Sequence, residues 1–329
     1  MTWRALFSGF RALPVDWDRT PVLIAVSGGA DSLALTLAYQ AFREAQGIVA
    51  PWGTATVDHR LRPASTQEAA QVAHWLEARA IPHATLTWAH GPLTTQVEER
   101  ARQARYDLLT DWARQNGFAA ILTAHHALDQ IETVLMRATR GAGLTGLRGI
   151  APVSERGGIL LLRPFLGVFP EDLRRRLAEA GQPFVEDPSN ESPEFERVRW
   201  RKALRFFGAR GLDLRGVARS IAALQGVEAQ LTAAAQAFVE AHVQATADGG
   251  RTVPLVSFRA LLPAVGERVL RRLLEEASGD RTPCPQRVLA ALQKKIAAPA
   301  FKGATAHHCT LRRIHGGRLR VEKERRGRA

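Results

Sequence analysis

The chain has 329 residues, of which 46% are apolar, enough for about two globular domains with a sizeable core. Its two cysteines, Cys284 and Cys309, are too few for a disulfide framework or a thiolate metal site, which favours a cytoplasmic protein. No run of 18 apolar residues is present, and Arg4 and Arg11 interrupt the N-terminal segment. We therefore expect neither a membrane span nor a signal peptide.

The net charge of +13 is concentrated in the C-terminal part of the chain. Residues 1–200 carry 21 basic and 22 acidic side chains, whereas residues 201–329 carry 24 basic and 10 acidic ones. This asymmetry favours a polyanionic partner that docks on the C-terminal part. A solvated basic surface with no partner is the alternative.

After a short helix expected within residues 1–20, an apolar strand at 22–26 runs into a glycine turn and a helix. Together they make an anion site, because the first N–H groups of a helix lack partners and its dipole places positive charge there. Glycine allows close approach of a phosphate, serine adds hydroxyl donors and Asp31 can hold Mg²⁺. An ordinary Gly-Gly turn is the alternative. The residues concerned are Ser27, Gly28, Gly29, Ala30, Asp31 and Ser32.

Further strands at 52–57, 83–88 and 119–124 alternate with helices at 65–79, 94–116 and 127–139. Ser65 and Glu68 have the spacing of a capping box at the start of the first of these helices. The alternation predicts a parallel, doubly wound α/β sheet, in which ligands bind at the carboxyl ends of the strands. The glycine turn, residues 58–62 and residues 125–132 should therefore converge on one crevice.

An apolar stretch at 158–165 and a short helix at 170–181 precede a loop that runs into a basic helix at 186–206. Beyond residue 210 the chain is Ala/Leu-rich and helical at 212–245 and 255–279, and its final stretch alternates around His315 as a β-hairpin does. We expect a catalytic domain over 1–209 and a smaller, mainly helical, basic domain over 210–329.

His125, Asp129 and Glu132 would share one face if they lay on one helix, since they are spaced i, i+4, i+7. Two carboxylates on that face could hold an ammonium group or Mg²⁺. An acidic face that only contacts solvent is the alternative. Zinc is disfavoured because no His-Glu-x-x-His motif and no nearby cysteine is present.

Two more segments carry polar groups. Asp58 and His59 follow the second strand, where an adenosine could be recognised, although a polar turn would have the same composition. Arg197, Arg199 and Arg201 would splay around a helix and could contact phosphates or a developing negative charge, or simply form a basic surface.

SGGADS matches the S-G-G-x-D-S pyrophosphate loop of the N-type ATP pyrophosphatases, and it fits neither a Walker P-loop nor a dinucleotide fingerprint. Together with five further segments in order, it resembles the tRNA(Ile)-lysidine synthase family over roughly residues 20–206. Those segments are VDHRLRPAS (57–65), EERARQARYDLL (98–109), HHALDQIET (125–133), RGAGLTGLRG (140–149) and EDPSN (186–190) before an Arg-rich helix.

The resemblance implies an enzyme that ligates L-lysine to C2 of the wobble cytidine of tRNA(Ile) with a CAU anticodon. ATP is split to AMP and pyrophosphate through an adenylated cytidine, and codon recognition changes from AUG to AUA. The implied catalytic residues are Asp31, Asp129, Glu132 and Arg201. The implied ATP-binding residues are Ser27, Gly28, Gly29, Ala30, Asp31, Ser32, Asp58 and His125. Asp31 is the implied Mg²⁺ ligand, and the implied tRNA contacts are Arg197, Arg199 and Arg201.

The sequence departs from the family at Leu128, where a second acid is usual, and at Val198 and Trp200 in the basic helix. A tRNA 2-thiolase is a rival, but both cysteines lie beyond residue 280, and a GMP synthetase-like enzyme would need a glutaminase for which there is no room. A non-catalytic RNA-binding protein is the rival from another class, and the intact acidic residues argue against it. The oligomeric state stays open, with a homodimer as one option.

Overall fold

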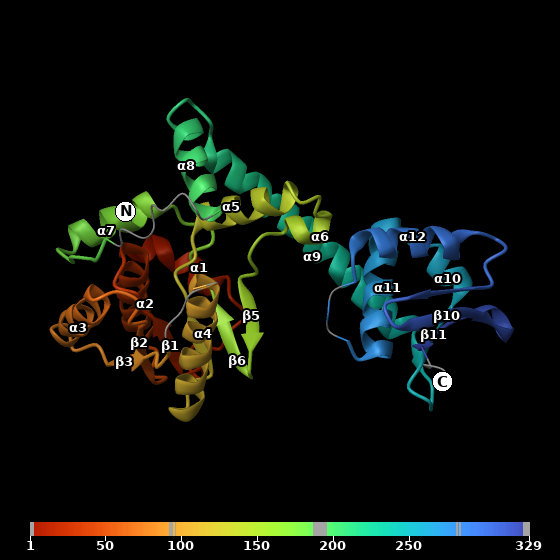
Figure 1. Ribbon diagram of the computed structural model, residues 1–329, viewed down its shortest axis with the longest axis horizontal. Helices are drawn as coiled ribbons and strands as arrows, with labels where there is room; N and C mark the ends of the chain where they lie inside the picture. Colours follow the sequence, from red (N-terminus) through yellow and green to blue (C-terminus); the bar gives the residue numbers. More distant parts are fainter. Residues whose placement is uncertain are drawn as a thin grey trace. The chain divides into compact units, whose positions relative to one another are not determined.

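The computed structural model describes residues 3–91, 95, 97–186, 196–280, 282 and 284–324 (Figure 1). Residues 187–190 of the EDPSN segment and the last five residues lie outside these ranges. The chain divides into two compact units, the first made of residues 1–137 and 149–221 and the second of residues 138–148 and 222–329. The boundary near residue 221 falls inside helix α9 (Leu214–His242). The first part of this helix belongs to the first unit, since Ile221 packs in an apolar cluster with Ile131 and Leu204.

A six-stranded sheet with strand order β3-β2-β1-β4-β6-β5 forms the centre of the first unit (Figure 1). All neighbouring strands are parallel except β5 and β6. This confirms the predicted doubly wound α/β class. The strands are β1 (Val22–Ala25), β2 (Trp52–Asp58), β3 (His83–Thr87), β4 (Ala120–Leu122), β5 (Val153–Arg156) and β6 (Ile159–Leu162).

The sheet is covered on both faces because successive side chains of its strands alternate. Val22 and Ile24 are buried in a core with α1, α2, α3 and α7, whereas Leu23 is buried in a second core with α4. A cluster of aromatic rings, with Phe10 stacked on Phe42 at 4.9 Å, fills the first of these cores. The helices are η1 (Trp3–Leu6), α1 (Phe7–Arg11), α2 (Ala30–Gln46), α3 (Ala64–Glu77), α4 (Val97–Gln115), α5 (Ala127–Ala138), α7 (Pro170–Glu179) and α8 (Glu196–Gly208).

Two local expectations need correction. The capping box is wrong: α3 begins at Ala64, the Ser65 hydroxyl donates to Asp58 Oδ1, and Glu68 accepts both guanidinium arms of Arg62. Strand β5 was not expected at all. It pairs antiparallel with β6 through Gly157 and Gly158, whose φ angles of 55° and 82° suit a two-residue hairpin turn.

The second unit contains a five-stranded antiparallel sheet with order β7-β8-β11-β10-β9. The predicted hairpin is confirmed as β10 and β11, and it is extended by three strands that were not predicted. Apolar residues of α11 and α12, such as Leu270 and Leu289, pack with the sheet in a core of their own. The remaining elements are α6 (Leu144–Leu147), β7 (Gln244–Ala245), β8 (Arg251–Pro254), α10 (Leu255–Arg259), α11 (Pro263–Ser278), α12 (Gln286–Ala297), β9 (Gly303–Ala306), β10 (Cys309–Ile314), η3 (His315–Gly317) and β11 (Arg318–Lys323).

Among the described residues, no helix combines the length and apolar character needed to cross a membrane.

Candidate active site

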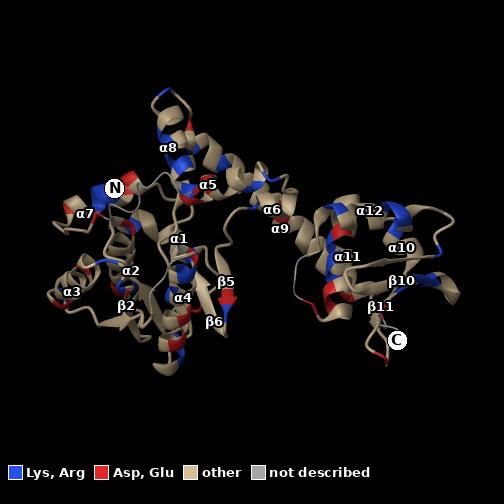
Figure 2. Ribbon diagram, viewed as in Figure 1, with Lys and Arg blue, Asp and Glu red and all other residues tan. Residues whose placement is uncertain are grey.

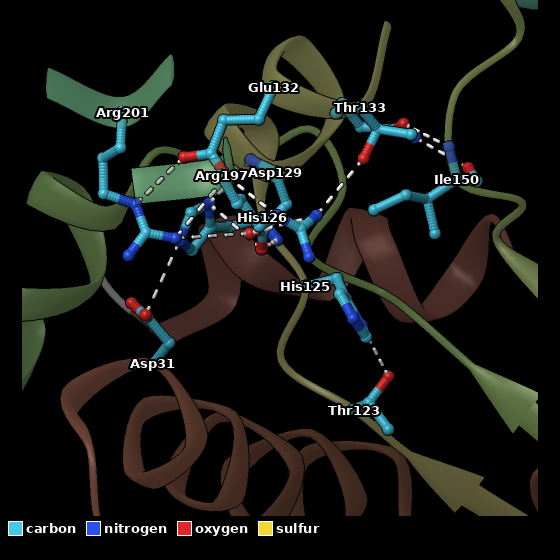
Figure 3. Close-up of polar contacts among 11 residues, drawn as sticks. Asp31, Thr123, His125, His126, Asp129, Glu132, Thr133, Ile150, Arg197 and Arg201 are labelled. Atoms are coloured by element: carbon cyan, nitrogen blue, oxygen red, sulfur yellow. Dashed lines mark hydrogen bonds and ion pairs between the residues drawn. The ribbon is translucent and has the colours of Figure 1, made fainter. Parts of the chain in front are cut away.

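Two of the three segments predicted to converge, the glycine turn and residues 125–132, meet at the carboxyl edge of the sheet, and residues 58–62 follow the neighbouring strand β2. Strand β1 lies between β2 and β4, so the turn after β1 is flanked by the loops that follow these two neighbours. The loop after β4 carries His125 and His126 into α5, and α8 supplies two arginines from the other side (Figure 3).

The glycine turn is tied into one shape by Ser32. Its hydroxyl accepts the N–H of Ser27 at 3.2 Å and donates to the carbonyl of Gly29 at 2.9 Å. Gly28 has a φ of +85°, and a Cβ placed on it would lie 2.6 Å from Val72 Cγ2. Only glycine therefore fits this position, and the turn leads directly into the N-terminus of α2 at Ala30.

Asp31 lies in the first turn of α2 and points toward α5 (Figure 3). Its Oδ2 is 3.6 Å from Nε2 of His126, while its Oδ1 is buried without a hydrogen-bond partner. Burial raises the pKa of this carboxyl, His126 opposes the rise, and the nearby Asp129 carboxylate adds to it. A buried carboxylate oxygen without a partner is a ligand that fits a hard cation such as Mg²⁺.

His126 joins Asp31 to Asp129, and the sequence analysis did not identify it. Its Nδ1 accepts the backbone N–H of Asp129 at 3.3 Å, which leaves the proton of a neutral ring on Nε2, facing Asp31. Its own N–H donates to Asp129 Oδ2 at 3.0 Å. The sequence contained a signal for this role: His126 follows His125 in the segment after the apolar strand β4 and lies three residues before Asp129.

Glu132 is completely buried on α5 and is held by two arginines of α8 (Figure 3). Nε of Arg197 lies 2.9 Å from its Oε2, and Nε of Arg201 lies 3.0 Å from its Oε1. The expected splaying of the arginines is wrong for this pair, because a spacing of four residues places both on one helical face. Arg199 is exposed and is not part of this cluster.

Asp129 is the carboxylate of α5 that faces Asp31 through His126. The guanidinium groups of Arg197 and Arg201 approach its Oδ1 at 3.8 and 4.0 Å. Burial opposes its ionisation, but His126 and Arg197 outweigh burial and lower its pKa. Leu128, where the family usually has an acid, packs instead into the apolar cluster of Ile131 and Leu204.

Asp58 and His125, two of the predicted ATP-binding residues, are held by hydrogen bonds to nearby residues. Asp58 accepts hydrogen bonds from Thr66, Ser65 and the N–H of Arg60, which overcome the effect of burial and lower its pKa. The helical face predicted for His125 is wrong, since α5 begins only at Ala127. His125 bonds Thr123 at 3.0 Å, and burial lowers its pKa to about 3, so the ring is neutral at physiological pH.

Within the described ranges, no three His, Cys, Asp or Glu side chains are grouped so that they could hold a metal by themselves. The two cysteines are buried in the core of the second unit, where the Cys309 thiol lies 3.5 Å from the Leu274 carbonyl. A magnesium ion at Asp31 would thus complete its coordination with water and phosphate oxygens, as this ion commonly does.

The fold and site define the class of protein. A family model described as a PP-loop domain matches residues 9–205, so the chain is a PP-loop protein and uses ATP. A solved structure of a U34-tRNA thiolase from Methanococcus maripaludis has the same fold, with a TM-score of 0.55 and 12% identity over 68% of this chain and 78% of that one.

More specifically, the chain belongs to the tRNA(Ile)-lysidine synthase family. It is 42% identical over 313 residues to the tRNA(Ile)-lysidine synthase of Methylobacterium sp. (strain 4-46), covering 92% of this chain and 89% of the relative. It is 39% identical over 271 residues to that of Rhodopseudomonas palustris, covering 82% and 77% of the two chains.

Proposed function

We propose that the chain ligates L-lysine to C2 of the wobble cytidine of a tRNA(Ile) with a CAU anticodon, forming lysidine at the expense of ATP. The observation that carries this proposal is the line Asp31–His126–Asp129. It joins the loop suited to pyrophosphate with a carboxylate suited to an amine. One site can thus serve both an adenylation and an amine attack.

In the first step, the cytidine O2 attacks the α-phosphate of ATP, the bond to the β-phosphate breaks, and pyrophosphate leaves. The N–H groups at the start of α2 and the hydroxyl of Ser27 stabilise the leaving pyrophosphate, while Ser32 holds the turn in shape. Asp31 would hold Mg²⁺, which supplies positive charge at the phosphates when bound. Arg201 contributes a second positive group on the α8 side.

In the second step, the lysine ε-amine attacks C2, and the C2–O bond breaks to release AMP. An amine attacks only in its neutral form, so a carboxylate beside it must take up a proton. We assign this role to Asp129, because Glu132 is fully occupied by Arg197 and Arg201. Glu132 then acts as a positioning residue that fixes the two guanidinium groups.

We assign binding of the tRNA body to the second unit. Lys and Arg positions lie along α11, α12 and β10 (Figure 2), and residues 222–329 of this unit carry 18 basic and 9 acidic side chains. Contacts of cations with phosphates supply affinity that does not depend on sequence. We also infer a cytoplasmic location from the proposed tRNA substrate and the use of ATP.

The test is a reaction of the purified full chain with ATP, Mg²⁺, lysine and a CAU-anticodon tRNA, followed by nuclease digestion and mass spectrometry. We expect lysidine at the wobble position, and pyrophosphate release that requires the tRNA. A matched tRNA with a GAU anticodon should remain unmodified. Unmodified cytidine in the CAU tRNA under every condition would rule the proposal out.

A further inference from the structure

Helix α8 has two chemically distinct faces. Arg197 and Arg201 face the buried Glu132, and Leu204 packs beside them against Ile131 of α5. Helical geometry at 100° per residue places Arg199, Lys202 and Phe206 on the opposite face. All three of these residues are exposed. The inner side of α8 is thus occupied by the cluster around Glu132, whereas Lys202 and Phe206 on its outer side are exposed.

Two large aromatic rings at the end of α8 are exposed to an unusual degree. The side chains of Phe206 and Phe207 are 51% and 53% exposed, and their rings stand nearly perpendicular, at 84°, with centroids 5.4 Å apart. The guanidinium of Arg210 lies 3.6 Å above the Phe206 ring. We call these three residues the α8 aromatic surface. Adjacent exposed aromatic side chains in contact with an arginine are typical of a binding surface.

The charge around the α8 aromatic surface indicates what would cover it. Residues 197–212 contain six Lys or Arg and no acid. Figure 2 shows these cations along α8. Aromatic rings interleaved with cations bind single-stranded nucleic acid: the cations contact the backbone while bases stack on the rings. A partner protein would need a matching acidic surface, whereas RNA has one charge per nucleotide.

We propose that the α8 aromatic surface stacks unpaired bases of the anticodon loop next to the wobble cytidine. This inference rests on the proposed function, which places that cytidine at Asp31 and Asp129. An unpaired loop offers bases that can splay onto aromatic rings, as recognition of single-stranded RNA requires. The inner face of α8 then serves the reacting nucleotide, and the outer face holds its neighbours.

The experiment uses the full chain and an anticodon stem-loop hairpin with 2-aminopurine at single loop positions. Stacking on an aromatic ring quenches the fluorescence of this base. We expect wild-type protein to quench at least one loop position, and Phe206→Ala/Phe207→Ala to lose that quenching and to bind the hairpin about tenfold more weakly. Phe206→Tyr/Phe207→Tyr, which keeps two flat rings, should restore both signals.

Val49→Ala is the matched control, since Val49 is an apolar residue of the same unit that is 83% exposed. It should bind the hairpin as the wild type does. Unchanged quenching and affinity in the double alanine variant would overturn the inference. So would a variant that loses self-association in sedimentation while it binds RNA normally, since the surface would then be an interface between copies of the chain. Absence of lysidine formation with ring-dependent hairpin binding would instead contradict the proposed function alone.

Discussion

The imidazole of His126 lies 3.6 Å from the carboxylate of Asp31, so a residue that follows β4 is a neighbour of a residue that follows β1. The same ring accepts the N–H of Asp129. His126 therefore links the proposed Mg²⁺ ligand, Asp31, to the proposed amine-side carboxylate, Asp129. We propose that it is a positioning residue shared by the two half-reactions.

We expect His126→Asn to slow both pyrophosphate release and lysidine formation by about 10- to 100-fold, because the variant loses the ring nitrogen that lies 3.6 Å from the Asp31 carboxylate. Quenched-flow measurements with labelled ATP and labelled lysine would separate the two steps. His74→Asn is the control, because His74 is exposed on α3. If only one step slows, His126 does not serve both.

Asp31→Asn should abolish pyrophosphate release while tRNA binding survives, because the variant lacks the carboxylate that would hold Mg²⁺ beside the phosphates. The same change should stabilise the free protein at pH 7. The pKa of Asp31 is raised in the folded protein, so its protonated form favours folding. This contribution to the free energy of unfolding is present below the unfolded pKa of 3.8 and is lost as pH rises through the folded pKa, whereas the asparagine of the variant carries no charge at any pH.

Thermal melts of the wild type and Asp31→Asn between pH 3 and pH 8 test this prediction. The melting temperature of the variant should exceed that of the wild type at neutral pH, and the difference should vanish on acidification below about pH 4. A variant that is less stable at pH 7 and also fails to bind tRNA would mean that Asp31 supports the fold.

Gly28→Ala should destabilise the fold by about 1–2 kcal/mol and raise the KM for ATP. The added methyl combines a positive φ with a clash against Val72, which moves the turn. Gly47→Ala provides the control, because Gly47 has a φ of +68° but no atom within 4 Å of the added Cβ. Denaturant unfolding and ATP kinetics should show that only Gly28→Ala changes the KM.

Glu132→Gln should lower the free energy of unfolding by about 3 kcal/mol, because Arg197 and Arg201 lose their buried countercharge and keep the more distant Asp129, at 3.8 and 4.0 Å. Asp111→Asn, which breaks the exposed ion pair with Arg114, should cost less than about 1 kcal/mol. Urea titrations measure both values. Equal effects would show that burial does not strengthen the Glu132 cluster.

Lys294→Gln/Lys295→Gln, on the exposed end of α12, should weaken tRNA binding about tenfold at low salt and reduce the slope of log K against log salt by about 1.5. The effect should be the same for CAU and GAU tRNAs, since phosphate contacts carry no sequence information. Arg19→Gln in the first unit is the control, and an unchanged slope in the lysine variant would remove α12 from the RNA-binding surface.

Local patterns were sufficient to predict the strand, glycine turn and helix from Val22 onward, because one apolar run and one glycine pair determine them. The short strands β7, β8 and β9 escaped prediction, since two to four residues form a strand only when a partner distant in sequence pairs with them. The same limit applies to the site. The Glu132 cluster depends on α8 packing against α5, which no spacing within either helix reveals.

Burial of Glu132 separates two kinds of electrostatics within one enzyme. At 0.1 M salt, dissolved ions largely screen interactions between exposed charges that are more than about 10 Å apart. They screen the ion pairs of Glu132 much less, because this carboxylate has no exposed surface. Added salt should therefore raise the tRNA concentration needed for half-maximal rate, yet leave the single-turnover rate at saturating tRNA nearly unchanged. Ionic strength becomes a means of varying substrate capture independently of bond formation.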